Sequence, residues 1–303
     1  MASRPVRQHA PVAGGRDIVV PGDGLRLAAT RWSGTGAPVV LLHGLASQRR
    51  FWNLVVPGLV GLPVVAIDQR GHGESDTPDH GYEMASVVRD VAIALDALAI
   101  SRAVLVGHSW GAAVAMSFAA AHPQRALAVV AVDGGITTPA SRWSRDEARE
   151  VLAPPRLEIA PDLLPGLLAQ GPLASWWSPE VEDAVLPIFG VHDDGLARAR
   201  LSFERHLALI DALYDYEPAT TLAGVACPAW LVVAQPLAVA ADDPGQEWLA
   251  QKQDAVTSAT AALAQPRVVI LAGAVHDVPL QWPALVSGIV RAAVDEVSRE
   301  VRS

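Results

Sequence analysis

The residues around Ser109 have the types and spacing needed for nucleophilic catalysis by a serine. Ser109 lies between Gly107 and Gly111 in a G-x-S-x-G pattern. The apolar run 104–106 before it is of strand type, and the alanine-rich run that follows to residue 121 is of helical type. This order is typical of a nucleophile elbow, in which a sharp turn holds the serine hydroxyl at the N-terminus of a helix. The helix dipole favours negative charge there, so the pattern predicts that Ser109 is a nucleophile.

A serine hydroxyl needs help to react. It is a weak nucleophile at neutral pH and requires a base within hydrogen-bonding distance, oriented in turn by a third group. The chain has nine histidines and 32 acidic residues, so the partners depend on which elements bring them near Ser109.

Apolar runs and helix-prone runs alternate along most of the chain. Strands are expected at 17–20, 25–32, 38–42, 63–67, 104–106, 126–132, 229–234 and 267–271, and helices at 51–59, 84–100, 112–121, 246–263 and 283–301. Such alternation predicts an α/β fold with a mostly parallel sheet covered on both faces. Ligand sites in these sheets lie at the carboxyl ends of the strands. We therefore expect a shared edge for the residues that follow strand-like runs, namely His43, Asp68, Ser109 and Asp133.

Two segments depart from this alternation. Residues 1–15 are polar and contain proline and glycine, and they are predicted to form a disordered arm. Residues 137–221 are helix-prone and interrupted by prolines. Their aromatic side chains fit two roles equally well, the lining of an apolar pocket or a small core of the segment itself; they are Trp143, Trp176, Trp177, Phe189, Tyr214 and Tyr216.

The composition and net charge of the chain argue against several classes of function. The 303 residues are 51% hydrophobic, which is enough for one large α/β domain. A net charge of −9 argues against a nucleic-acid partner. One cysteine, Cys227, leaves no disulfide framework, and one lysine, Lys252, argues against Schiff-base chemistry. The two long uncharged stretches, 103–124 and 218–241, are broken by glycine or proline, so we expect no membrane span and a cytoplasmic location.

Four landmarks in the chain resemble those of the α/β-hydrolase superfamily. They are His43-Gly44, the segment 68–75, the elbow 107–111 and a late histidine, His276, after the last strand-like run. They occur in the order typical of the family, and the resemblance covers nearly the whole length. It implies a core of about eight strands, formed by residues 16–136 and 222–303, with a helical cap inserted at 137–221.

The resemblance also implies roles for the site residues. His276 stands where the family places its base. Many members place the acid after the strand predicted at 229–234, where this chain has no carboxylate before Asp242 and Asp243. Some branches, including certain haloalkane dehalogenases and thioesterase domains, take the acid from the strand after the elbow helix, where Asp133 lies. We favour Asp133 and leave Asp242 and Asp243 open.

An oxyanion hole needs two backbone N–H groups. By resemblance these belong to Trp110, the residue after the nucleophile, and Leu45, just past His43-Gly44. Arg70 and Glu74 lie in a loop that the family uses to brace its core, which implies a structural role for both.

These assignments predict a serine hydrolase that cleaves a small, largely apolar ester, lactone or thioester through an acyl-enzyme, with no metal or cofactor. The alternatives are a carbon–carbon bond or amide hydrolase with the same residues, and a non-hydrolytic member that binds a small ligand. A serine at the elbow argues against epoxide-hydrolase and dehalogenase chemistry, which use aspartate there. A hydroxynitrile lyase would need a lysine near the site, and Lys252 is expected in a polar helix away from it. The oligomeric state stays open.

Overall fold

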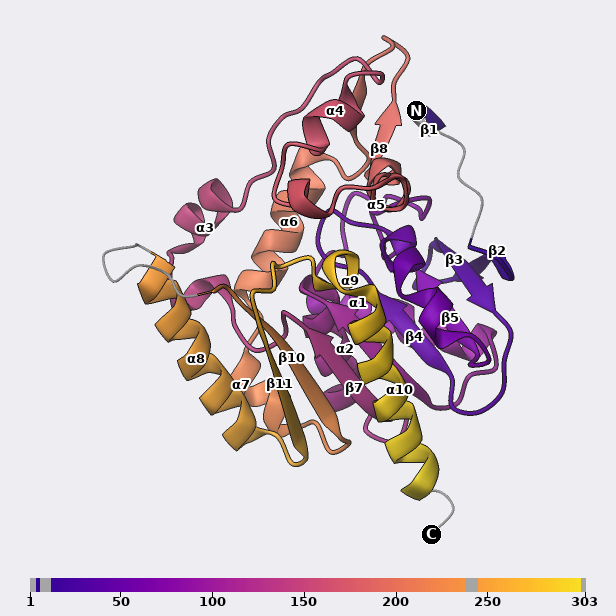
Figure 1. Cartoon of the computed structure of the whole chain (residues 1–303), viewed down its shortest axis with the longest axis vertical. Helices are drawn as coiled ribbons and strands as arrows, with labels where there is room; N and C mark the ends of the chain where they lie inside the picture. Colours follow the sequence, from indigo (N-terminus) through magenta and orange to yellow (C-terminus); the bar gives the residue numbers. More distant parts are fainter. Residues whose placement is uncertain (1–3, 6–11, 238–244, 301–303) are drawn as a thin grey trace.

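The computed structural model describes residues 4–5, 12–237 and 245–300. Its centre is an eight-stranded sheet in the order β11-β10-β7-β6-β4-β5-β3-β2 (Figure 1). Strand β3 is antiparallel to both β2 and β5, and the other neighbouring pairs are parallel. The predicted mostly parallel sheet of about eight strands is therefore confirmed. Its strands are β2 (Gly15–Pro21), β3 (Arg26–Trp32), β4 (Val39–Leu42), β5 (Val64–Ile67), β6 (Ala103–His108), β7 (Ala126–Val132), β10 (Ala229–Gln235) and β11 (Pro266–Ala272).

Helices cover both faces of this sheet. One apolar core lies between the sheet and α1 (Met84–Ala97), α2 (Trp110–Ala121), α7 (Pro218–Ala223) and α8 (Gly245–Ala262). The other lies beneath η1 (Arg49–Leu54), η2 (Val56–Leu59), α9 (Val278–Gln281) and α10 (Pro283–Glu300), and α10 crosses in front of the sheet in Figure 1. The α-helix expected over 51–59 is instead two 3-10 segments, because Pro57 has no N–H to continue a helix. Among the described residues, no helix is both long and apolar enough to cross a membrane.

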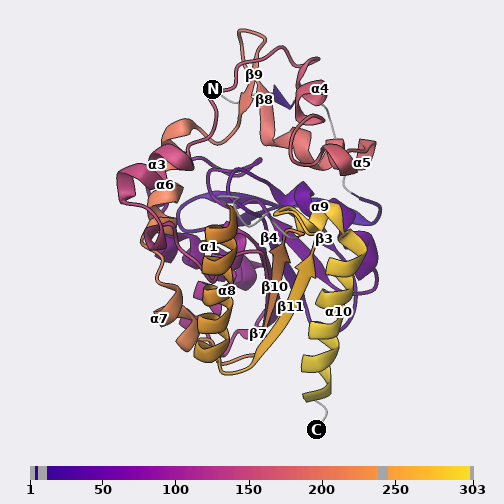
Figure 2. The ribbon, with the colours of Figure 1, turned by 60° about the vertical axis from the view of Figure 1, so that its left-hand side comes forward.

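The residues between β7 and α7, 133–217, form what we call the insert. It lies at one end of the sheet in both ribbon views (Figures 1 and 2). Its elements are η3 (Pro139–Ser141), α3 (Arg145–Val151), α4 (Leu164–Leu168), η4 (Ala174–Trp176), α5 (Pro179–Val185), η5 (Leu186–Ile188), β8 (Phe189–Val191), β9 (Ala197–Ala199) and α6 (Phe203–Tyr214). The boundary expected at residue 221 falls inside α7, which packs on α2 and α8 instead of joining the insert.

The insert also contains strands that its helix-prone sequence does not predict. Strands β8 and β9 pair with β1 (Arg4–Pro5) in a small three-stranded sheet. Arg4 is paired with Val191 and Pro5 with Gly190. The prediction of a disordered arm over residues 1–15 is therefore wrong for Arg4 and Pro5, and for Gly15, where β2 begins. Residues 1–3 and 6–11 lie outside the described part of the chain.

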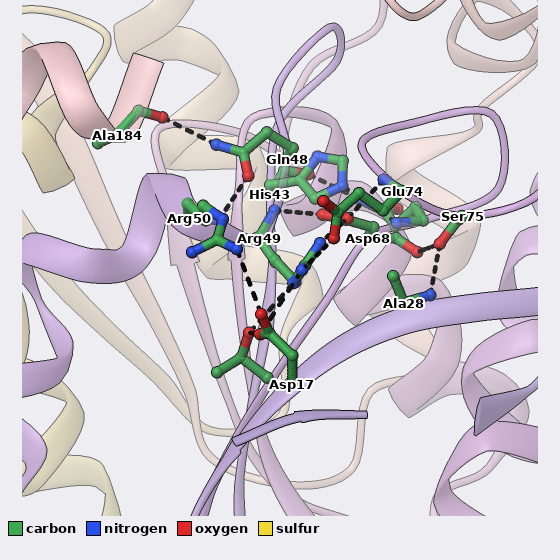
Figure 3. A network of polar contacts seen from close by, with 12 residues as sticks. Asp17, Ala28, His43, Gln48, Arg49, Arg50, Asp68, Glu74, Ser75 and Ala184 are labelled. Atoms are coloured by element: carbon green, nitrogen blue, oxygen red, sulfur yellow. Dashed lines mark hydrogen bonds and ion pairs between the residues drawn. The ribbon is translucent and has the colours of Figure 1, made fainter. Parts of the chain in front are cut away.

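A buried ion-pair network braces the loop 68–75 (Figure 3). Arg49 and Asp68 form a salt bridge with their side chains 2% and 0% exposed. The Arg49 backbone N–H donates to Asp68 Oδ1 at 2.5 Å, and its guanidinium also reaches Glu74 Oε2 at 2.5 Å. In the same loop, the Arg70 guanidinium donates to both oxygens of Asp90 on α1, at 2.6 and 2.8 Å. Arg70 and Glu74 thus form ion pairs with other residues of the fold, Asp90 and Arg49 respectively.

Candidate active site

Ser109 stands on a strained turn between β6 and α2. Its φ of 52° and ψ of −116° are rare for a residue other than glycine. Its N–H donates to the Val132 carbonyl at 2.9 Å. Small residues are required on both sides, because a β-carbon on Gly107 would lie 2.1 Å from the Gly111 carbonyl oxygen and one on Gly111 would lie 2.2 Å from that of Leu42. This geometry is that of the predicted elbow.

The carboxyl ends of neighbouring strands bring Asp133 and His276 together. Asp133 follows β7 directly, and His276 lies in the loop after β11. The His276 Nδ1–H group donates to Asp133 Oδ2 at 2.7 Å. Asp133 also has a positive φ, 46°, and its N–H donates to the Val232 carbonyl at 2.7 Å. The other two acid candidates, Asp242 and Asp243, lie outside the described residues.

Ser109, Asp133 and His276 line one cavity of about 260 Å³. Its walls are largely apolar and come from the sheet, α8 and the insert; they include Ile136, Leu152, Leu213, Leu231, Val233 and Trp248. Among the six aromatic residues singled out in 137–221, Trp143 lines this cavity. Phe189 packs in a small core of the insert, and Trp177 packs against the core of the sheet. Both roles left open by the sequence therefore occur, in different residues.

Known proteins resemble this chain in sequence over part of its length and in fold over nearly all of it. Residues 37–157 match the family described as alpha/beta hydrolase fold. The crystal structure of E-2-(acetamidomethylene)succinate hydrolase superimposes with a TM-score of 0.75 at 22% identity, covering 93% of this chain and 99% of that one. The chain has the α/β-hydrolase fold.

Curated relatives within the superfamily match over about a third of this chain. Epoxide hydrolase B of Mycobacterium tuberculosis is 43% identical over 101 residues, which are 32% of this chain and 28% of the relative. The 2-(acetamidomethylene)succinate hydrolase of Mesorhizobium japonicum is 38% identical over 104 residues, 34% of this chain and 37% of the relative. These alignments span less than half the length of the relatives.

Lys252 is the site residue that the sequence did not reveal. The one lysine of the chain lies on α8, and its ammonium group donates to Asp133 Oδ1 and to the Ala234 carbonyl, each at 2.6 Å. Its side chain is 13% exposed and lines the cavity. The expectation that Lys252 lies away from the site is therefore wrong, and the argument against hydroxynitrile-lyase chemistry that depended on it does not hold. A sequence signal existed, since a single lysine among 23 basic residues is unusual.

Asp133 is thus held by three donors, and these set the electrostatics of the site. Oδ2 faces His276, while Oδ1 accepts from Lys252 and from the Ala234 N–H at 2.9 Å. Burial raises the pKa of Asp133, but the hydrogen bond from His276 and the charge of Lys252 outweigh it, so this pKa is lowered. Desolvation lowers the pKa of His276, but the hydrogen bond and charge of Asp133 raise it above its ordinary value. A base at His276 is neutral only above that pKa, so catalysis by it must increase with pH.

Replacing Lys252 by methionine tests this arrangement. The ammonium charge lowers the pKa of His276, so its loss raises that pKa and moves the acid limb of the kcat/KM profile to higher pH. The plateau value is expected to fall roughly tenfold, because Asp133 loses a charge-assisted hydrogen bond. The measurement is a pH–rate profile for one ester with the wild type, Lys252→Met and the charge-preserving Lys252→Arg. An acid limb that stays in place for Lys252→Met would contradict the role assigned to the ammonium.

His108 holds the loop that carries His276. Its ring is buried, stacks on Phe51 with 4.8 Å between centroids, and donates from Nε2 to the His276 carbonyl at 2.9 Å. Burial and the neighbouring His276 lower the pKa of His108 to about 4, so the ring is neutral at pH 7. Gln281 on α9 fixes the same loop by accepting from the Val275 N–H at 2.7 Å.

The two backbone donors predicted for an oxyanion hole lie near Ser109. Trp110 is the first residue of α2, where helical N–H groups have no partner within the helix. Leu45 follows Gly44, and a β-carbon on Gly44 would lie 3.2 Å from the Ser109 β-carbon. The loop that carries Leu45 therefore runs directly beside Ser109.

Two buried histidines fix this loop. His43 Nδ1 donates to the Gly44 carbonyl at 2.8 Å, and His72 Nε2 accepts from the Ala46 N–H at 3.3 Å. Burial lowers the pKa of His43 to about 4 and that of His72 to about 3. Both rings are therefore neutral at pH 7, and each has one nitrogen that donates and one that accepts. Leu45 lies between the two backbone groups that they hold.

Proposed function

We propose that this chain is a serine hydrolase that cleaves a small ester, lactone or thioester through an acyl-enzyme. The observation that carries the proposal is the 2.7 Å hydrogen bond between Asp133 and His276 in the cavity that the strained Ser109 also lines. A nucleophile, a base and an acid that orients the base are the minimum for this chemistry.

In the proposed reaction, the Ser109 oxygen attacks the substrate carbonyl and His276 Nε2 accepts the hydroxyl proton. Asp133 stabilises the imidazolium, and the Trp110 and Leu45 N–H groups hold the oxyanion. His276 then gives its proton to the leaving alcohol or thiol as the carbonyl–heteroatom bond breaks. A water molecule, deprotonated by His276, attacks the acyl-enzyme and releases the acid and free Ser109.

The cavity supports a small substrate. Its volume of about 260 Å³ is slightly below the usual range for pockets that bind drug-sized ligands. The insert contributes wall residues such as Trp143, Leu152 and Leu213, which supports a role for the insert as the cap of the site. The cavity wall is mainly hydrocarbon, so the part of the substrate that contacts this wall is expected to be apolar.

The same three residues fit amide and carbon–carbon bond hydrolysis, and the names of the similar proteins span more than one reaction. Ser109 argues against the reaction named for the epoxide hydrolase, because a serine adduct of an epoxide would be an ether, which water cannot hydrolyse through an oxyanion. Esters and thioesters are the first substrates to test because alcohols and thiols are better leaving groups than amines or carbanions.

The decisive test is labelling with a small fluorophosphonate followed by intact-mass measurement. The wild type is expected to gain one adduct, and Ser109→Ala none, with hydrolysis of small esters lowered by roughly 10³-fold or more. Circular dichroism of both proteins controls for folding. A folded wild type that gains no adduct and hydrolyses no ester would exclude a serine hydrolase and favour a ligand-binding member.

A further inference from the structure

The Arg142 guanidinium lies over two tryptophan rings at the cavity. Its guanidinium carbon lies 4.7 Å from the Trp143 ring centroid and 4.9 Å from that of Trp248. Trp143 belongs to the insert and Trp248 to α8, and all three residues line the cavity with Ser109. Stacking on aromatic faces restrains a guanidinium and leaves its N–H edge available for hydrogen bonds.

This cation has no carboxylate partner within residues 12–237 and 245–300, unlike its neighbours. Arg145 pairs with Asp215 and Asp211, and Arg149 pairs with Asp211. Of the charged residues that line the cavity, Lys252 and Asp133 neutralise each other. When His276 is neutral, the described residues that line the cavity therefore carry a net charge of one positive unit, which is on Arg142.

We propose that Arg142 binds a carboxylate of the substrate, so that the substrates are carboxylate-bearing esters, lactones or thioesters, such as half-esters of small dicarboxylic acids. The carboxylate accepts two hydrogen bonds from the guanidinium, while the carbonyl to be cleaved lies at Ser109 and the hydrocarbon between them contacts the apolar wall. A cavity of about 260 Å³ lets one small molecule reach both ends. The inference rests on the proposed function and names its substrate class.

The kinetic test compares two matched ester series. Monomethyl esters of C4 to C6 dicarboxylic acids are set against methyl esters of the monocarboxylic acids of equal chain length. The wild type is expected to favour the anionic series, and Arg142→Gln is expected to lower that preference 10- to 100-fold, the effect of a charge-assisted hydrogen-bonded pair. Arg149→Gln is the matched control, because its guanidinium pairs with Asp211 and does not line the cavity; it should keep the wild-type preference. Equal losses for both series in Arg142→Gln would overturn the proposal.

A binding measurement separates this proposal from the proposed function. Titration calorimetry with monomethyl glutarate uses Ser109→Ala protein, with and without Arg142→Gln, and needs no turnover. Binding that weakens at least tenfold on loss of Arg142 supports the carboxylate site even if the chain hydrolyses nothing. Binding that is absent from the Ser109→Ala protein, or unchanged by Arg142→Gln, overturns it even if neutral esters are cleaved.

Discussion

Replacing Asp133 by asparagine is expected to lower kcat for ester hydrolysis by about 10⁴-fold. The Asp133 carboxylate accepts the hydrogen bond that sets the tautomer of His276, and an amide can donate there and favour the wrong one. The substitution also removes the negative charge that Lys252 faces, which leaves an ammonium group without its ion-pair partner beside the base. Steady-state kinetics with one ester, at a pH well above the acid limb, measure the loss.

Asp277→Asn is the control for this change. Asp277 is adjacent to His276 in sequence, but its carboxylate lies 4.0 Å from His108 Nε2. We expect a loss of less than about tenfold, because only a distant charge changes. Near-normal turnover by Asp133→Asn would reassign the acid, and Asp242 and Asp243 would be the next carboxylates to replace.

Arg49→Met is expected to destabilise the fold by about 3–5 kcal/mol, the usual effect of removing one partner of a buried ion pair. Asp68 would remain fully buried with its negative charge uncompensated, and Glu74 would lose the same guanidinium. The residues concerned lie on η1 and in the loop 68–75 and do not line the cavity, so the primary effect is on folding. Urea denaturation followed by tryptophan fluorescence gives the change in free energy of unfolding.

Arg26→Met provides the comparison for stability. Arg26 pairs with Asp76, but the two side chains are 77% and 37% exposed. An exposed pair contributes at most about 1 kcal/mol, so the urea midpoint should move little. If the two variants lose similar stability, burial of the Arg49 pair is not what holds the loop in place.

The central strands could be predicted because burial dictates their composition. Strands β4, β5 and β6 are buried along their whole length. Strands that are covered on both faces consist of nearly continuous apolar residues, which are easy to recognise in a sequence. The small sheet could not be predicted, because it joins Arg4 to Val191 across most of the chain and each strand is only two or three residues long. Such short strands leave no periodicity to detect.

The candidate site residues that could be predicted from the sequence are those that the sheet itself positions. Ser109 and Asp133 follow strands directly, so the topology of a parallel sheet places them before any side chain is considered. Lys252 meets Asp133 only because α8 packs beside β10 with that helical face turned inward. Arg142 meets Trp248 across the insert and α8. Contacts made by the tips of long side chains depend on packing, which no local pattern encodes.

The position of the single lysine also determines how the protein reacts with amine-directed reagents. Apart from the α-amino group, the chain contains one primary amine, and that amine is enclosed beside Asp133. Arginines supply every other basic side chain except the histidines, so amine-directed cross-linkers, dyes and immobilisation resins find no lysine on the exterior of the fold. Any reagent that does modify a lysine must reach this amine through one of the two pockets that Lys252 lines, and the modified residue then reports on access to Asp133.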